Sequence, residues 1–127
     1  MEIILLGYIS AGFPSQSEET LLESLSLEEW LIKNPSSTFL IKVVGESMLE
    51  AGILPGDFVL IDRALYPKNN DIVVVRIEDE WTMKYFFKEG DKILLKSAHP
   101  QYPPLTVSSE RDIEIFGVVV AVIRKYR

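Results

Sequence analysis

From residue 38 to the end of the chain, apolar residues occur in short runs rich in valine, isoleucine and aromatic side chains, separated by tight turns. Runs of this kind predict β-strands. We expect strands at Thr38–Val44, Phe58–Asp62, Ile72–Ile77, Trp81–Phe87, Lys92–Lys96, Leu105–Val107 and Ile113–Lys125. Many short strands with a single helix indicate a mostly β fold built on a strongly bent sheet.

The last predicted strand contains a long apolar run, from Val118 to Ile123. A strand that is apolar on both faces is usually buried on both faces. We therefore interpret most of this run as core. Part of it could instead form an interface with a second chain.

The N-terminal quarter has a different pattern. Residues 1–10 form an apolar, β-prone arm that can pair as an edge strand, either within the chain or on a partner. Residues 15–23 are polar and acidic, and we expect them to be loosely ordered or briefly helical. The chain is divided accordingly into an N-terminal arm, residues 1–25, and a β domain, residues 26–127.

The one predicted helix begins at Ser26, which forms a capping box with Glu29. Leu27, Trp30 and Leu31 follow at helical spacing, and Pro35 ends the helix after the preceding residue. The apolar face of this helix either packs on the domain or docks a protein partner, and the pattern favours packing.

Composition narrows the class of protein. The 127 residues are 47% hydrophobic and 10% aromatic, which indicates a folded domain with a substantial core rather than a disordered chain. The absence of cysteine excludes disulfides, a thiol nucleophile and cysteine-ligated zinc, and it suits a reducing cytoplasm. The apolar runs are too short for a signal peptide or a membrane span, so we expect a soluble, cytoplasmic protein.

The net charge of −6 argues against direct binding of nucleic acid, because phosphate contacts require a basic surface. The basic residues cluster only at the C-terminus, in residues 124–127. Protein partners are therefore favoured.

The segment from Val43 to Asp57 carries the most distinctive candidate chemistry. A short strand enters Gly45, Ser47 follows at the turn, and Met48 to Ala51 can form about one helical turn before Pro55-Gly56-Asp57 begins a new strand. A serine at such a position exposes its hydroxyl next to unpaired backbone N–H groups, which can hold an oxyanion. The alternative is a serine that only caps the turn.

A nucleophilic serine requires a base, and the chain offers few. Its single histidine, His99, lies in a loop before a proline. Lys84 lies in an aromatic, strand-like run without an adjacent acid, where desolvation would favour the neutral amine. The alternative is a strand lysine that extends its ammonium group to water.

These segments together resemble the LexA/UmuD family of self-cleaving Ser–Lys peptidases. The resemblance rests on Gly45-Glu46-Ser47-Met48, Gly52-Ile53, Pro55-Gly56-Asp57, Thr82-Met83-Lys84, Phe116-Gly117-Val118-Val119 and, upstream, Ala11-Gly12. It covers nearly the whole chain from Ala11. Phe13-Pro14-Ser15 and the segment from Leu31 to Ser36 are most similar to the UmuD branch, whose members assist an error-prone DNA polymerase.

The resemblance implies a barrel-like sheet, no cofactor or metal, and a catalytic dyad of Ser47 and Lys84. Ser47 would attack the carbonyl of Ala11 in the Ala11–Gly12 bond, and the backbone N–H groups of Ser47 and Met48 would hold the oxyanion. Stimulation by a RecA–single-stranded DNA filament, a homodimer, and a UmuC-like polymerase partner in mutagenic, translesion synthesis during the SOS response are implied as well.

Other interpretations stay open at this point. Without the resemblance, Ala11–Gly12 is an ordinary flexible linker. The arm before Ala11 is shorter than in typical UmuD proteins, and the absence of a preceding helix-turn-helix domain disfavours LexA-like repression. The alternatives to self-cleavage are a non-catalytic interaction module of the same fold, such as a stand-alone phage or plasmid relative, and a peptidase that acts on other proteins.

Overall fold

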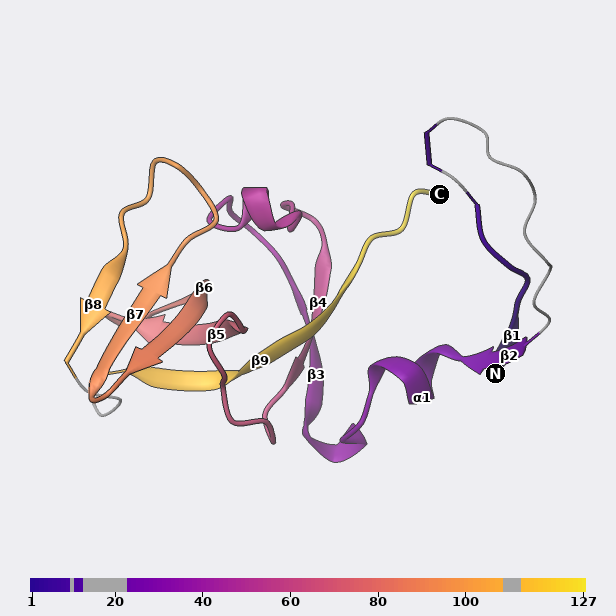
Figure 1. Cartoon of the computed structure of the whole chain (residues 1–127), viewed down its shortest axis with the longest axis horizontal. Coiled ribbons are helices and arrows are strands. Elements are labelled where there is room, and N and C mark those ends of the chain that lie inside the picture. Colours follow the sequence, from indigo (N-terminus) through magenta and orange to yellow (C-terminus); the bar gives the residue numbers. More distant parts are fainter. Residues whose placement is uncertain (10, 13–22, 109–112) are drawn as a thin grey trace. The chain divides into compact units, whose positions relative to one another are not determined.

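The computed structural model describes residues 1–9, 11–12, 23–108 and 113–127 (Figure 1). The chain forms two compact units, Met1–Lys33 and Asn34–Arg127. The predicted division at residues 25 and 26 stays a prediction. The expected loose or helical character of residues 15–22 lies outside the described residues.

In the first unit, strand β1 (Glu2–Leu5) pairs antiparallel with β2 (Glu23–Ser26), and helix α1 (Leu27–Leu31) follows directly. The capping interaction forms as predicted, because Ser26 Oγ accepts a hydrogen bond of 3.3 Å from the Glu29 N–H. The helix is shorter than expected. It ends at Leu31 because Ile32 is already extended.

The apolar residues of α1 lie on the surface of the first unit, and their packing on the β domain stays a prediction. Leu27 and Trp30 are exposed, and the helix has no buried residue. The helices of the described ranges are all too short to span a membrane.

The second unit is a seven-stranded antiparallel sheet in the order β3-β4-β9-β5-β6-β7-β8. The strands are β3 (Thr38–Lys42), β4 (Phe58–Asp62), β5 (Ile72–Ile77), β6 (Glu80–Glu89), β7 (Lys92–Lys96), β8 (Leu105–Val107) and β9 (Glu114–Ile123). Short 3₁₀ helices occupy Pro35–Ser37 (η1) and Leu49–Ala51 (η2). The prediction of a mostly β, strongly bent sheet is confirmed, although the sheet is not a closed barrel.

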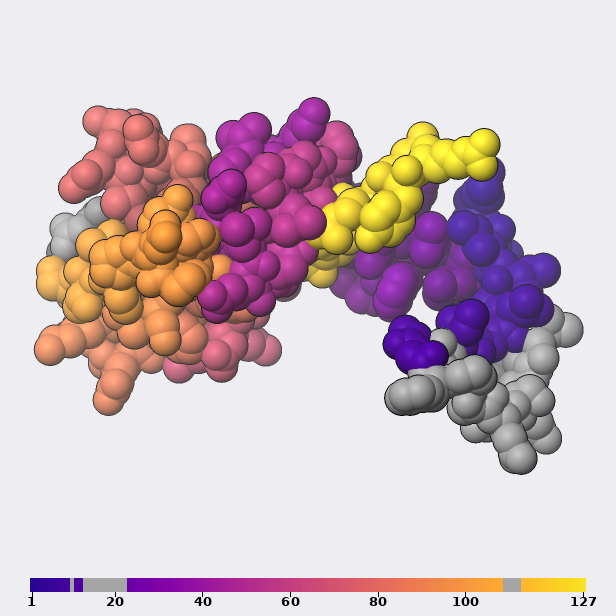
Figure 2. All heavy atoms as spheres, turned by 90° about the horizontal axis from the view of Figure 1, so that it is seen from above, coloured from indigo at the N-terminus to yellow at the C-terminus, as the bar shows by residue number. Residues whose placement is uncertain are grey.

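The two ends of the sheet carry different segments of the chain. The orange strands β7 and β8 lie at one end, and the purple to magenta strands β3 and β4 lie toward the other (Figures 1 and 2). Strand β9 bridges the two parts because it pairs with both β4 and β5.

Two hydrophobic clusters cover opposite faces of the sheet. Val73 and Val75 contribute to one cluster with Phe86, while Val74, between them, contributes to the other with Met48. This alternation follows from the two-residue period of a strand. The turn that contains Ser47 and Met48, called the serine turn below, therefore packs on only one of the two clusters, through Met48.

Strand β9 is core only in part. Gly117 and Val118 are buried, but Val120, Val122 and Ile123 are exposed. The prediction that most of this strand is buried is therefore wrong for its second half. That half pairs with β4 along one edge, but its side chains are not buried by the described residues on both faces of the sheet.

Candidate functional site

Ser47 is positioned by a turn that is anchored on its far side. Gly45 adopts φ +104°, which only glycine accommodates without strain, and directs the chain out of the strand region. Met48 is almost fully buried, and its carbonyl accepts hydrogen bonds from the N–H groups of Ala51 and Ile53. The Ser47 hydroxyl is consequently held at the rim of the core.

The loop after the serine turn is held by an ion pair that the sequence analysis did not identify. Asp57 is buried and accepts hydrogen bonds of 2.6 Å from both Nε and Nη2 of Arg124. The same arginine donates to the Gly52 carbonyl at 2.8 Å, and Asp57 also accepts from the Leu54 N–H. The hydrogen bonds from Arg124, followed by that from Leu54, lower the pKa of Asp57 to about 2.

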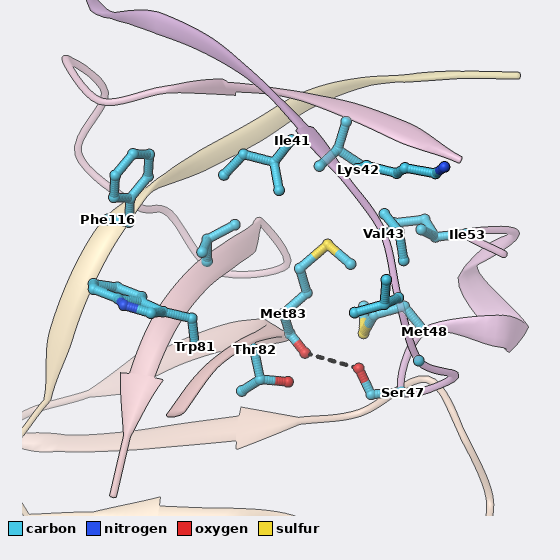
Figure 3. Close-up of a pocket in the computed structure, with 14 residues that line it drawn as sticks. Ile41, Lys42, Val43, Ser47, Met48, Ile53, Trp81, Thr82, Met83 and Phe116 are labelled. Atoms are coloured by element: carbon cyan, nitrogen blue, oxygen red, sulfur yellow. Dashed lines mark hydrogen bonds between the residues drawn. The ribbon is translucent and has the colours of Figure 1, made fainter. Parts of the chain in front are cut away.

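The Ser47 hydroxyl donates to the main-chain carbonyl of Met83 at 3.3 Å (Figure 3). Strand β7 pairs with β6 only from Tyr85 onward, so the earlier part of β6 has an open edge toward the serine turn. The turn thus places Ser47 against the residue that precedes Lys84.

Lys84 is partly buried, and its Nζ donates to Ser97 Oγ at 2.5 Å. The ring centroid of Tyr102 lies 5.6 Å from the same nitrogen. Burial lowers the pKa of Lys84 below its ordinary value of 10.5, and no Asp or Glu in the described part of the chain forms an ion pair with it. Such an environment makes the ammonium group of Lys84 easier to deprotonate than that of an exposed lysine, which is the property that a general base requires.

Ser47 and Lys84 do not bond to each other in this arrangement. Each side chain has another partner among the described residues, Met83 O for the serine and Ser97 Oγ for the lysine. The Ser47–Lys84 dyad therefore stays a prediction, supported by the adjacency of Met83 and Lys84 in β6.

The predicted oxyanion donors are the backbone N–H groups of Ser47 and Met48. Within the residues that the structure describes, neither group donates a hydrogen bond, whereas the next N–H group, that of Leu49, donates to Glu46 O. Two neighbouring unpaired donors beside a serine hydroxyl can stabilise a developing oxyanion.

An apolar pocket of about 460 Å³ adjoins Ser47. Ile41, Met83 and Met48 contribute to its walls, and Trp81 and Phe116 lie at the end away from the serine (Figure 3). The Trp81 and Phe116 rings meet edge to face, with centroids 5.8 Å apart. The pocket can hold an apolar peptide segment next to the hydroxyl.

The remaining predicted residues lie elsewhere. Ala11 and Gly12 are exposed and belong to the first unit, whereas Ser47 and Lys84 belong to the second. His99 stacks on Tyr102, and its Nδ1 accepts from the Gln101 N–H, so His99 takes part in the loop structure. No group of three or more His, Asp or Glu side chains within the described ranges could hold a metal ion.

The comparisons with known proteins agree with one another on the family of this chain. A model of the Peptidase S24-like family matches residues 4–120. The LexA repressor of Sorangium cellulosum is 39% identical over 127 residues, which cover 98% of this chain and 55% of that protein. The LexA repressor of Clostridium kluyveri is 39% identical over 126 residues, covering 99% and 61%. The chain thus spans a little more than half of the length of these relatives, which are LexA repressors rather than UmuD proteins.

Proposed function

Because the chain belongs to the Peptidase S24-like family, we propose that it is a self-cleaving serine peptidase in which Ser47 and Lys84 cut the Ala11–Gly12 bond. The observation that carries this proposal is the placement of a serine hydroxyl against the backbone of β6, one residue before a desolvated lysine and beside an apolar pocket.

In the proposed reaction, the Ser47 hydroxyl exchanges its bond to Met83 O for one to the neutral amine of Lys84. The amine takes the proton while Ser47 Oγ attacks the Ala11 carbonyl, and the N–H groups of Ser47 and Met48 bind the resulting oxyanion. Lys84 then returns the proton to the departing Gly12 amine. Water hydrolyses the acyl-enzyme, which releases residues 1–11 with a free carboxylate and leaves a chain that begins at Gly12.

The test is the intact mass of the protein after incubation at neutral and alkaline pH, with and without RecA–single-stranded DNA filaments. We expect a new species that begins at Gly12 and that is absent from Ser47→Ala and Lys84→Ala. Lys96→Ala is the matched control, because Lys96 is an exposed lysine on the neighbouring strand and should leave cleavage intact. Cleavage in Lys84→Ala at the wild-type rate would exclude the dyad.

We further propose that the protein acts in the SOS response in the manner of UmuD. Filament binding would favour the conformation in which the cleavage segment enters the site, which is a population shift rather than new chemistry. The cleaved form would then join a UmuC-like polymerase in translesion synthesis. The support for this finer assignment is the UmuD-like sequence of residues 13–15 and 31–36. Copurification of the cleaved form, but not the Ser47→Ala form, with such a polymerase would test it.

The proposal includes a homodimer. Val120, Val122 and Ile123 expose an apolar surface on the second half of β9, which a second copy of the chain could cover. Sedimentation equilibrium of wild type and Val122→Glu would test this arrangement, with dissociation expected for the variant.

A non-catalytic interaction module is the second candidate. The specific observation in its favour is that Ser47 and Lys84 are each bonded to another group rather than to one another. This candidate predicts no cleavage at any pH, with or without the filament, so the mass measurement distinguishes the two.

A further inference from the structure

We propose that Ser97 is a positioning residue that orients the amine of Lys84 toward Ser47. This inference rests on the proposed function and adds a third side chain to the predicted dyad. Its basis is the hydrogen bond of 2.5 Å between Lys84 Nζ and Ser97 Oγ, the single side-chain hydrogen bond that Lys84 makes within the described residues.

Ser97 is well placed to act as a fixed acceptor. It follows the last residue of β7, and the next residue, Ala98, is buried in the same hydrophobic cluster as Met48. The Ala98 carbonyl accepts a hydrogen bond of 2.8 Å from the Glu50 N–H. The orange loop that begins at Ser97 and the purple turn that contains Glu50 are side by side in both views (Figures 1 and 2).

This connection couples the two sides of the site. The loop that contains Ser97 is joined by the hydrogen bond at Ala98 to the 3₁₀ helix η2, which begins two residues after Ser47. A shift of the loop would therefore move the serine turn as well. Preorganisation of this kind is what holds reacting groups in a productive geometry.

The hydroxyl of Ser97 is chemically suited to this role. A neutral amine has two N–H donors and one lone pair, so an acceptor that takes one N–H restricts where the lone pair points. A hydroxyl is also uncharged, and it does not stabilise the ammonium form as a carboxylate would. Lys84 can thus be oriented without the large rise in pKa that an ion pair would cause.

The other titratable groups around Lys84 do not replace this contact. The serine turn contributes Glu46 and Glu50, and the loop contributes His99 and Tyr102, of which only Tyr102 contacts the ammonium group, through its ring. Opposite Lys84 on β5 is Val73, which does not titrate. A substitution at Ser97 is therefore a direct test of how the amine is oriented.

The experiment measures the first-order rate of self-cleavage against pH for wild type, Ser97→Ala, Ser97→Thr and Ser97→Asp, with Ser36→Ala as an exposed serine control. Ser97→Ala should lower the maximal rate by roughly ten- to a hundredfold without raising the pH midpoint. Ser97→Thr, which keeps the hydroxyl, should restore most of the rate. Ser97→Asp should raise the midpoint by about 1–3 pH units, because it pairs the ammonium. Wild-type rates and an unchanged pH profile in Ser97→Ala and Ser97→Asp would overturn the proposal.

A second measurement separates this proposal from the proposed function. The titration of Lys84 Nζ is followed by NMR in Ser47→Ala protein, which cannot cleave itself, with and without Ser97→Asp. A higher Lys84 pKa in the double variant supports the contact even if wild type never cleaves, in which case only the proposed function fails. An identical Lys84 titration in the two proteins refutes the role of Ser97.

Discussion

Gly117 offers the sharpest test of how tightly the sheet is packed beneath the site. A Cβ atom added at this position would lie 2.7 Å from Ile61 Cγ2, 2.9 Å from the carbonyl oxygen of Asp62 and 3.2 Å from Arg63 Cα. Two of these three atoms belong to the backbone of Asp62 and Arg63, and backbone atoms cannot rotate away as a side chain can. We therefore expect Gly117→Ala to destabilise the second unit through overpacking.

The size of the effect follows from these contacts. Overpacking of a core typically costs about 1–3 kcal/mol, and a clash with backbone belongs in the upper half of that range. For a unit of this size, each kcal/mol lowers the melting temperature by about 4–5 °C, so the expected decrease is about 10 °C. The register of β9 shifts next to this position on its other side, against β5, where Val74 pairs with Gly117 and Val75 pairs with Ile115.

The assay is thermal unfolding followed by circular dichroism, with all variants in the Ser47→Ala background so that processing cannot interfere. Gly12→Ala is the control, because no atom lies within 4 Å of a Cβ added there. A Gly117→Ala protein that melts within about 2 °C of its parent would refute the reasoning, since it would show that the backbone at Asp62 yields without appreciable cost.

Two further predictions concern pH. Arg124→Met should shift acid unfolding to higher pH, because the low pKa of Asp57, about 2, gives stability that is present above the ordinary carboxyl pKa and lost as pH falls toward 2; coincident acid-unfolding curves would contradict this. Self-cleavage should accelerate as pH rises and level off with a midpoint below 10.5, because burial lowers the pKa of Lys84; a midpoint at or above 10.5 would exclude a desolvated base.

The strands that sequence reasoning located best are those with both a clear pattern and clear turns. Strands β4, β5, β7 and β8 have the predicted bounds, because tight turns delimit short apolar runs. Strand β6 begins one residue early, at Glu80, since Glu78 and Asp79 adopt positive φ and form a tight hairpin turn. Strand β2 was missed because its sequence, ESLS, has little β propensity and depends on pairing with β1.

Only those residues of the candidate site that lie within a short, distinctive sequence pattern could be proposed from the sequence. The turn made Ser47 a candidate and the aromatic strand made Lys84 one, because each pattern lies within a few residues, but the dyad was predicted only through the family resemblance and stays a prediction. Ser97 and the pair of Asp57 and Arg124 were not identified. Their contacts join residues 13 and 67 positions apart in the chain, and such contacts depend on strand order, which no short motif specifies.

The pairing of β1 with β2 has a consequence for the peptide that the proposed cleavage would release. Ala11–Gly12 lies between these two strands in sequence, so before cleavage the covalent chain keeps them at a high effective concentration. The proposed cleavage would leave four paired residues to hold a separate peptide, and a two-stranded hairpin is marginally stable even when continuous. Dilution would therefore remove residues 1–11, which makes religation negligible. It also leaves the edge of β2 unpaired and available to a new strand.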